Sequence, residues 1–196
     1  ANKWSKAHPK ANSAPRVSPE GRYHNGWSEY QYSQWFISND TLTEYSCFPF
    51  GLGKYNCYHK ERYPEQIWEI ASDTMTVCGQ LCQKAVCRFR GRDYAAWFTP
   101  NIPIPYGPWK FGGLPGVILK VSDKDNLYSF ECVRISTHKK PLLKDEYSRY
   151  NEMERRKLLK LQRGINEDYG NYIKLTNTKT GEPVRIFSEY EPIELE

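Results

Sequence analysis

Six cysteines are the residues of this 196-residue chain with the clearest capacity for chemistry. They are Cys47, Cys57, Cys78, Cys82, Cys87 and Cys132. An even set of thiols in a chain of this size is typical of an oxidising compartment, where cysteines pair as disulfides. We therefore predict disulfides among these six. One candidate pair, Cys47 with Cys57, would close a loop across the turn at 51–53 and stabilise the fold by roughly 3 kcal/mol.

The same thiols allow two other kinds of chemistry. Cys78, Cys82 and Cys87 stand near the spacing of a structural zinc site, for which His59 would be the fourth ligand. The spacing lacks the Cys-x2-Cys of a zinc knuckle, so we predict no metal and no cofactor. A reactive Cys82 would need His59 or His138 as its base, and nothing in the sequence places either imidazole beside it.

Other catalytic patterns are absent from the sequence. The four histidines are scattered, without the His-Glu-x-x-His of a metalloprotease, and no Gly-x-Ser-x-Gly nucleophile elbow is present. The glycines at 51–53 lack the rest of a phosphate-binding loop. The sequence therefore favours a protein that is not an enzyme and assigns no catalytic residue.

Charge and hydropathy argue against two further classes of protein, those that bind nucleic acids and those that span a membrane. The net charge of +5, from 28 basic and 23 acidic residues, is too small to indicate nucleic-acid binding. No apolar stretch is long enough to span a bilayer, so we predict no transmembrane segment. No charged-then-apolar leader opens the chain, and we expect any signal peptide to have been removed already.

Most of the chain has the pattern of β-strands. From Trp27 onward, short alternating stretches are separated by Gly, Asn, Asp and Pro, without intervening helices. This favours an antiparallel meander, with a core rich in aromatic residues, which form 15% of the chain. We predict a mainly β (α+β) fold, as a curved antiparallel sheet or a half-open barrel. It would form a single domain over 27–196, preceded by a flexible basic tail at 1–26.

One segment has a helical period instead. Near 142–163, apolar residues return every three or four positions, acidic residues stand in the first turn and basic residues in the last. The apolar positions are Leu143, Tyr147, Tyr150, Met153, Leu158 and Leu161. Gly164 follows as a natural end. The pattern predicts one long amphipathic helix.

Residues 102–116, which we call the signature loop, contain four prolines and four glycines. The prolines fix φ, so 102–108 should be a stiff, extended run that completes no sheet ladder. Residues 114–117 predict a type II turn. The glycines expected to shape the loop and its turn are Gly112, Gly113 and Gly116.

The end of the loop reads Gly113-Leu114-Pro115-Gly116-Val117-Ile118, and with it the chain resembles the GLPGLI family of small secreted Bacteroidota proteins. Val117 replaces the usual second Leu of that motif. Shorter spaced matches run from about 60 to 196, and they are Trp68-Glu69-Ile70, Asp73-Thr74, Val77-Cys78-Gly79, Cys82-Gln83-Lys84-Ala85, Phe89-Arg90-Gly91-Arg92, Ala96-Trp97-Phe98-Thr99, Ile102-Pro103 and Pro192-Ile193-Glu194-Leu195. The resemblance implies export and a mainly β domain, and no known biochemical activity.

We therefore expect an exported, non-enzymatic binding or interaction module, in the periplasm, at the outer-membrane surface or secreted. Its partner would be an envelope protein, such as an outer-membrane transporter. Loops carry function more often than sheet cores do, so the expected contact residues lie on the signature loop. They are Tyr106, Trp109, Phe111, Leu114 and Pro115. Two alternatives stay open: a metal- or thiol-dependent protein that uses the Cys/His set, and a carrier of a small apolar ligand.

Two threonines are candidate modification sites. Asp40-Thr41-Leu42 and Asp73-Thr74-Met75 fit the Asp-Thr-apolar pattern that exported Bacteroidota proteins use for O-glycosylation. The pattern predicts a glycan on Thr41 or Thr74 in the native host.

Overall fold

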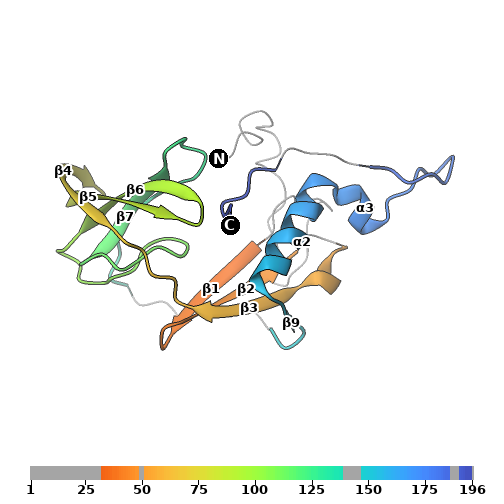
Figure 1. The fold of residues 1–196 in the computed structure, drawn as a ribbon, viewed down its shortest axis with the longest axis horizontal. Helices are drawn as coiled ribbons and strands as arrows, with labels where there is room; N and C mark the ends of the chain where they lie inside the picture. Colours follow the sequence, from red (N-terminus) through yellow and green to blue (C-terminus); the bar gives the residue numbers. More distant parts are fainter. Residues whose placement is uncertain (1–31, 49–50, 139–146, 186–189, 196) are drawn as a thin grey trace. The chain divides into compact units, whose positions relative to one another are not determined.

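The computed structural model describes residues 32–48, 51–138, 147–185 and 190–195 (Figure 1). The predicted tail at 1–26 lies outside these residues. The chain divides into two compact units. The inserted unit has 64–138 and 193–195 as its described residues, and the flanking unit has 32–48, 51–63, 147–185 and 190–192. Whether 27–196 behaves as a single domain stays a prediction.

The inserted unit is a five-stranded antiparallel meander. Its strands are β4 (Glu69–Val77), β5 (Gln80–Phe89), β6 (Arg92–Thr99), β7 (Val117–Asp123) and β8 (Ser129–Glu131), and they pair in chain order. Two-residue turns at 78–79 and 90–91, with positive φ at all four residues, join the first three strands. Such turns match the twist of paired strands, so the hairpins follow directly from their sequence. The prediction of a mainly β, antiparallel fold is confirmed.

Side chains of this sheet alternate between two cores. Ala85, Cys87 and Phe89 of β5 enter one core, while Cys82 of the same strand enters the other. Strand residues an odd number of positions apart face opposite sides, which separates Cys82 from Cys87. The first core is the larger, and its buried members are Ala85, Cys87, Phe89, Tyr94, Ala96, Phe98, Phe111, Leu114, Ile118 and Val121.

The flanking unit is a four-stranded sheet with a helix packed on it (Figure 1). Its strands are β1 (Tyr32–Ser38), β2 (Thr41–Cys47), β3 (Cys57–Arg62) and β9 (Asn151–Glu152), in that order, and a 3-10 turn η2 (Gly53–Tyr55) precedes β3. β1, β2 and β3 are antiparallel, whereas β9 runs parallel to β3. Helix α2 (Arg155–Glu167) buries Leu158 and Ile165 against this sheet, and α3 (Tyr169–Ile173) follows it.

The helix differs from the prediction in both of its bounds. Among the described residues of 142–163, those before 155 are not helical, and residues 142–146 lie outside the described part. The ring of Tyr147 instead stacks on Tyr45 of β2, with centroids 3.7 Å apart, and Tyr150 meets the same ring edge-on at 6.0 Å. Tyr147 and Tyr150 are three positions apart because both rings cover Tyr45 of a strand. Their spacing is the same as that of residues on one face of a helix.

Gly164 does not end α2 but lies within it. A Cβ at this position would stand 2.2 Å from the Tyr172 hydroxyl of α3. The small residue leaves room for the Tyr172 side chain of the following helix, and it does not form a left-handed cap. None of the helices in the described ranges has the length and apolar character needed to cross a membrane.

Candidate functional site

The signature loop is a hydrogen-bonded structure of its own within the inserted unit. The Gly107 N–H donates to the Phe111 carbonyl at 2.9 Å, and the Gly113 N–H donates to the Pro105 carbonyl at 3.0 Å. These two hydrogen bonds flank an isolated antiparallel bridge between Tyr106 and Gly112, which is the only bridge between the two arms of the loop in the described chain. The extended run thus forms no regular ladder, as its prolines require.

The turn at the end of the loop differs from the predicted type II turn. The Gly116 N–H donates to the Leu114 carbonyl at 2.8 Å, which closes a three-residue turn, and the Val117 N–H donates to Ile102 at 3.0 Å. Gly116 has the expected positive φ, +153°. Glycine is needed here because the backbone of Thr99 lies close to it: a Cβ at position 116 would lie 2.1 Å from the carbonyl oxygen of Thr99.

Two side chains before β4 hold the loop in place. The buried amide of Gln66 donates to the Lys110 carbonyl at 3.0 Å and accepts from the Gly112 N–H at 2.8 Å. The indole N–H of Trp68 donates to the Gly112 carbonyl at 2.8 Å. Sequence reasoning missed Gln66, because a glutamine in a linker carries no signal of what its amide will meet.

Replacing Gln66 with leucine should lower the free energy of unfolding by about 2 kcal/mol, because two buried backbone groups of the loop would lose their partner. Urea denaturation measures the loss. The matched control is Gln83→Leu, whose amide donates a single bond to the Ala71 carbonyl at 3.0 Å from a half-buried position. It should cost less than about 1 kcal/mol. Equal losses in the two variants would contradict a specific role of Gln66.

The loop covers the larger core with aromatic rings. The Phe111 ring lies 4.7 Å from Tyr94 and 5.2 Å from Trp109, and the Trp109 ring lies 5.6 Å from Phe89. Phe111 is 1% exposed and Leu114 is 2% exposed. The expectation of partner contacts at Phe111 and Leu114 is therefore not met by their position, because both side chains are used to fill the core. Trp109 is half-buried and Pro115 is exposed.

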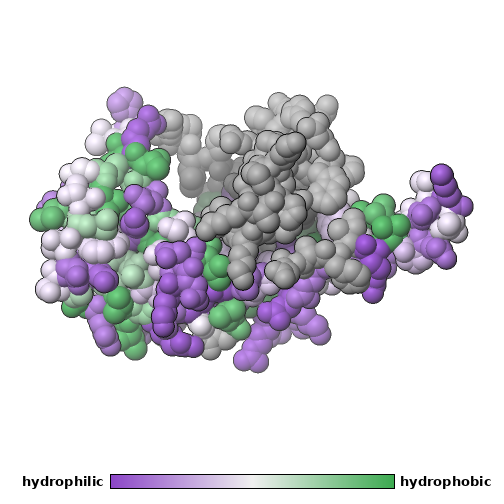
Figure 2. All heavy atoms as spheres, turned by 90° about the horizontal axis from the view of Figure 1, so that it is seen from above, coloured by the Kyte–Doolittle hydropathy of each residue, from purple (hydrophilic) through white to green (hydrophobic). Residues whose placement is uncertain are grey.

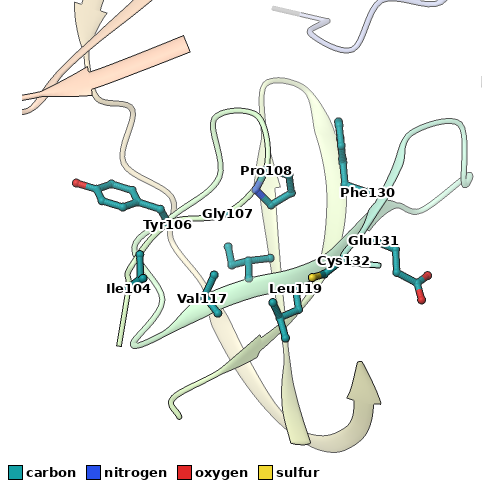
Figure 3. Close-up of a pocket in the computed structure, with 10 residues that line it drawn as sticks. Ile104, Tyr106, Gly107, Pro108, Val117, Leu119, Phe130, Glu131 and Cys132 are labelled. Atoms are coloured by element: carbon teal, nitrogen blue, oxygen red, sulfur yellow. The ribbon is translucent and has the colours of Figure 1, made fainter. Parts of the chain in front are cut away.

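An open apolar groove of about 630 Å³ lies beside the loop (Figure 3). Its lining comes from the loop, β7 and β8, and consists of Ile104, Tyr106, Gly107, Pro108, Val117, Ile118, Leu119, Phe130, Glu131 and Cys132. Ile104 is 51% exposed and Tyr106 44%, so apolar surface remains in contact with solvent. In Figure 3 the side chains of Tyr106 and Glu131 lie at opposite sides of the residues that line the groove. Of the predicted contact residues, the groove includes Tyr106 alone.

Apolar surface continues beyond the groove along the chain that follows β8. Val133 is 93% exposed and Ile135 is 40% exposed. Figure 2 shows hydrophobic residues at the surface of the inserted unit, next to hydrophilic ones. Glu131 is the charged residue of the groove lining, and its Oε2 forms an ion pair with Lys120 Nζ at 2.9 Å. An apolar floor with a charged rim is the composition of a binding surface.

A buried ion pair lies on the other side of the loop. Lys110 Nζ stands 2.6 Å from Glu194 Oε1, with both side chains at most 3% exposed, and Arg90 Nε lies 3.7 Å from Glu194 Oε2. The backbone around Glu194 is also fixed, since the Leu195 N–H donates to the Arg90 carbonyl at 3.0 Å. Sequence reasoning missed this pair. The available signal was that Lys110 stands between Trp109 and Phe111, and Glu194 between Ile193 and Leu195, so each charge is flanked by apolar residues.

A second polar cluster is buried in the flanking unit. His59 of β3 is 2% exposed, with Nδ1 3.9 Å from Glu44 Oε2 and Nε2 3.6 Å from Glu61 Oε1. The Ser33 and Ser46 hydroxyls donate to Glu44 Oε1 at 3.1 and 3.2 Å. The register pairs Glu44 with His59 across the strands, so both point to the same face. The His59 imidazole therefore lies between two carboxylates, at 3.9 and 3.6 Å.

The thiols near these clusters are not activated as nucleophiles. Cys57 lies on the same face of β3 as His59, but burial and the nearby Glu44 charge raise the pKa of Cys57 to about 11. Burial and Asp93 raise the pKa of Cys87 to about 12. Both therefore remain protonated at neutral pH, whereas a catalytic cysteine needs a lowered pKa.

The zinc-like set considered from the sequence is not brought together in the inserted unit, because Cys87 faces the opposite side of β5 from Cys82. In the described part of the chain, no group of three or more His, Cys, Asp or Glu residues is placed to hold a metal ion. His138, the other base considered for Cys82, is exposed.

The suggested Cys47–Cys57 disulfide conflicts with the register of β2 and β3. Cys57 lies opposite Ser46, and Cys47 is one position further along β2. Neighbouring residues of a strand point to opposite faces, so the two thiols lie on different sides of the sheet. All six cysteines are free in this structure. The wider prediction of disulfides in the native protein stays a prediction.

The two threonines proposed for glycosylation occupy different settings. Thr74 lies within β4 and is exposed. Thr41 begins β2 and is half-buried, and its hydroxyl donates to the Asn39 carbonyl at 3.5 Å. Of the two, Thr74 offers the more accessible hydroxyl, and modification at either site stays a prediction.

Comparison with protein families gives one match within the inserted unit. A family model described as a protein of unknown function (Porph_ging) matches residues 89–120, which contain β6, the whole signature loop and most of β7. The family's name suggests Porphyromonas and a Bacteroidota-like protein. No curated protein matches the sequence.

Comparison with solved structures shows a shared fold. Structures of PNGF-II in space groups P21 and C2 are similar to this chain with a TM-score of 0.50, at 19% and 18% sequence identity. The similarity covers 72% of this chain and 26% of the PNGF-II chain in both cases. The chain therefore spans about a quarter of the length of PNGF-II, and the likeness concerns the fold alone.

Proposed function

We propose that this chain is an exported binding module of the GLPGLI type, which acts in the cell envelope of a Bacteroidota species. Its partner is an apolar segment of another envelope protein, such as an outer-membrane transporter. The observation that carries the proposal is the groove beside the signature loop, where apolar side chains stay in contact with solvent although the loop itself is tightly fixed.

The rigidity of the loop supports a binding role. Gln66 and Trp68 hold its backbone, and Phe111 anchors it in the core. A partner that docks against Tyr106 and Ile104 would therefore lose little freedom by ordering the loop. Such preorganisation favours binding over a purely structural use of two exposed apolar side chains.

The size of the fold also supports a module. The PNGF-II structures contain a similar fold in about a quarter of their length, so this architecture occurs as one part of a larger chain. The match to a family model over the loop and its flanking strands agrees with a family resemblance centred on this loop. Neither likeness assigns an activity.

The groove supports one alternative, a carrier of a small apolar ligand. Its volume of about 630 Å³ lies in the range of ligand-binding pockets. The wide opening and the exposed Val133 and Ile135 beyond it favour a larger, extended partner. A thiol-dependent enzyme has less support, because burial raises the pKa of Cys57, Cys82 and Cys87.

Photo-cross-linking from the groove tests the proposal. With a benzoyl-phenylalanine in place of Tyr106, irradiation of the native envelope should yield a covalent adduct whose mass is that of this chain plus another protein. A gain of a few hundred daltons would instead identify the small-ligand carrier. The adducts are measured by intact mass and by peptide mapping.

The matched control carries the same photo-reactive residue in place of Ile70. This residue of β4 is 52% exposed and does not line the groove. Adducts formed at Tyr106 and absent at Ile70 would support the groove as the binding surface. Equal yields at both positions, or none at Tyr106, would overturn it.

A further inference from the structure

Three of the six thiols meet at one end of the inserted unit. Cys78 and Cys132 are half-buried and pack with the buried Cys82 in the smaller core, together with Val77 and Leu119. Burial and a hydrogen bond with the Cys78 thiol raise the pKa of Cys132. Both residues pack against the same small core, so the two thiols lie near each other although they follow strands at opposite edges of the meander.

This shared core shows that the sheet curls. Cys78 follows β4, which is one edge of the sheet, and Cys132 follows β8, which is the other edge. In a flat sheet, four strand spacings of about 4.8 Å would place these edges roughly 19 Å apart. A disulfide needs Cα atoms within about 7 Å of each other. A sheet that curls around the smaller core brings its two edges toward each other.

Local geometry fixes both partners. Cys78 has a φ of +49° in the two-residue turn between β4 and β5, and the Cys132 N–H donates to the Leu119 carbonyl at 2.7 Å. Each thiol thus projects from a constrained backbone position. Cys82 is buried beneath them, with its thiol directed to the Gln80 carbonyl at 3.5 Å.

We propose that Cys78 and Cys132 form a disulfide that joins the two edges of the curled sheet, and that Cys82 remains a thiol. The cross-link would enclose residues 78–132, and so the whole signature loop and its groove. Cys87 takes no part, because it faces the larger core on the other side of β5. The proposal does not depend on the identity of any binding partner.

The oxidation requires a disulfide donor, which an oxidising compartment supplies as a protein or small-molecule disulfide. The thiolate of one cysteine attacks that disulfide, forms a mixed disulfide and releases one thiol. The second cysteine then attacks the sulfur of the first and releases the other thiol. Two S–H bonds are lost, one S–S bond forms within the chain, and the donor is reduced to two thiols.

Peptide mapping tests the pairing directly. The purified full chain is equilibrated with oxidised glutathione, its remaining thiols are alkylated under denaturing conditions, and it is digested without reduction. A peptide that contains Cys132 should be linked to the one that contains both Cys78 and Cys82. Backbone fragmentation between these two residues should place the bond on Cys78 and the alkyl label on Cys82.

Two variants provide a stability readout. Oxidation should raise the Tm of the wild type by on the order of 10 °C, because the cross-link restricts the unfolded chain. Cys78→Ser should abolish this rise, and Cys82→Ala should retain it. A bond placed on Cys82, or no linked peptide in the wild type, would overturn the proposal even if a variant failed to fold.

Discussion

Replacing Gly116 with valine should lower the free energy of unfolding by about 4 kcal/mol or more, an unusually large effect for one substitution. A Cβ at this position would lie 2.1 Å from the Thr99 carbonyl oxygen, 2.6 Å from its carbon and 2.9 Å from Pro100 Cα. All three are backbone atoms, so no side-chain rotation relieves the clash. Either β6 must move away from the turn, or the turn must open. Chemical denaturation followed by tryptophan fluorescence measures the loss.

The matched control is Gly113→Ala in the same loop. Gly113 has a φ of +82°, and a Cβ there would meet nothing within 4 Å. This substitution carries only the cost of a left-handed residue, about 1–2 kcal/mol. Gly116→Ala adds the same Cβ and should also cost more than Gly113→Ala. Equal losses in the two alanine variants would show that the close approach to Thr99 is not the reason for glycine in the motif.

Replacing Lys110 with methionine should destabilise the protein by about 3–5 kcal/mol, because the buried carboxylate of Glu194 would lose its nearest cationic partner. The two groups lie 2.6 Å apart and are almost completely buried. Arg90 Nε, 3.7 Å from the same carboxylate, compensates for part of the charge. The loss is measured from urea unfolding curves at neutral pH.

Two comparisons separate charge from packing. The double variant Lys110→Met/Glu194→Leu should recover most of the stability, since an apolar pair of similar size avoids the unpaired charge. Lys120→Met breaks an exposed pair with Glu131 and should cost less than about 1 kcal/mol. A double variant as unstable as Lys110→Met alone would show that the lysine acts through packing.

The sequence was most informative where structure is local. The turns at 78–79 and 90–91 follow from short pairs that end in glycine, and the meander follows from the spacing of the strands they join. The position of Gly116 at a constrained turn also followed from its neighbours. The kind of turn did not, because Ile102 takes the hydrogen bond that a type II turn would have used.

Contacts between distant residues could not be predicted in this way. The pair Lys110–Glu194 joins residues 84 positions apart, and the packing of Cys78 and Cys132 against one core depends on the curl of the sheet. The apolar period near 142–163 was ambiguous, since Tyr147 and Tyr150 use the same spacing to cover Tyr45 of a strand. In each case the deciding information lies in another part of the chain.

The parallel pairing of β9 with β3 has a consequence for the order in which the chain folds. It joins residues such as Tyr58 and Glu152, which are 94 positions apart, while β4 to β8 all lie between them. During synthesis the meander can form from neighbouring hairpins as they emerge. The first three strands must wait for α2 before their apolar face is covered. Contacts of such large sequence separation form slowly, so the early strands remain the aggregation-prone part of the nascent chain.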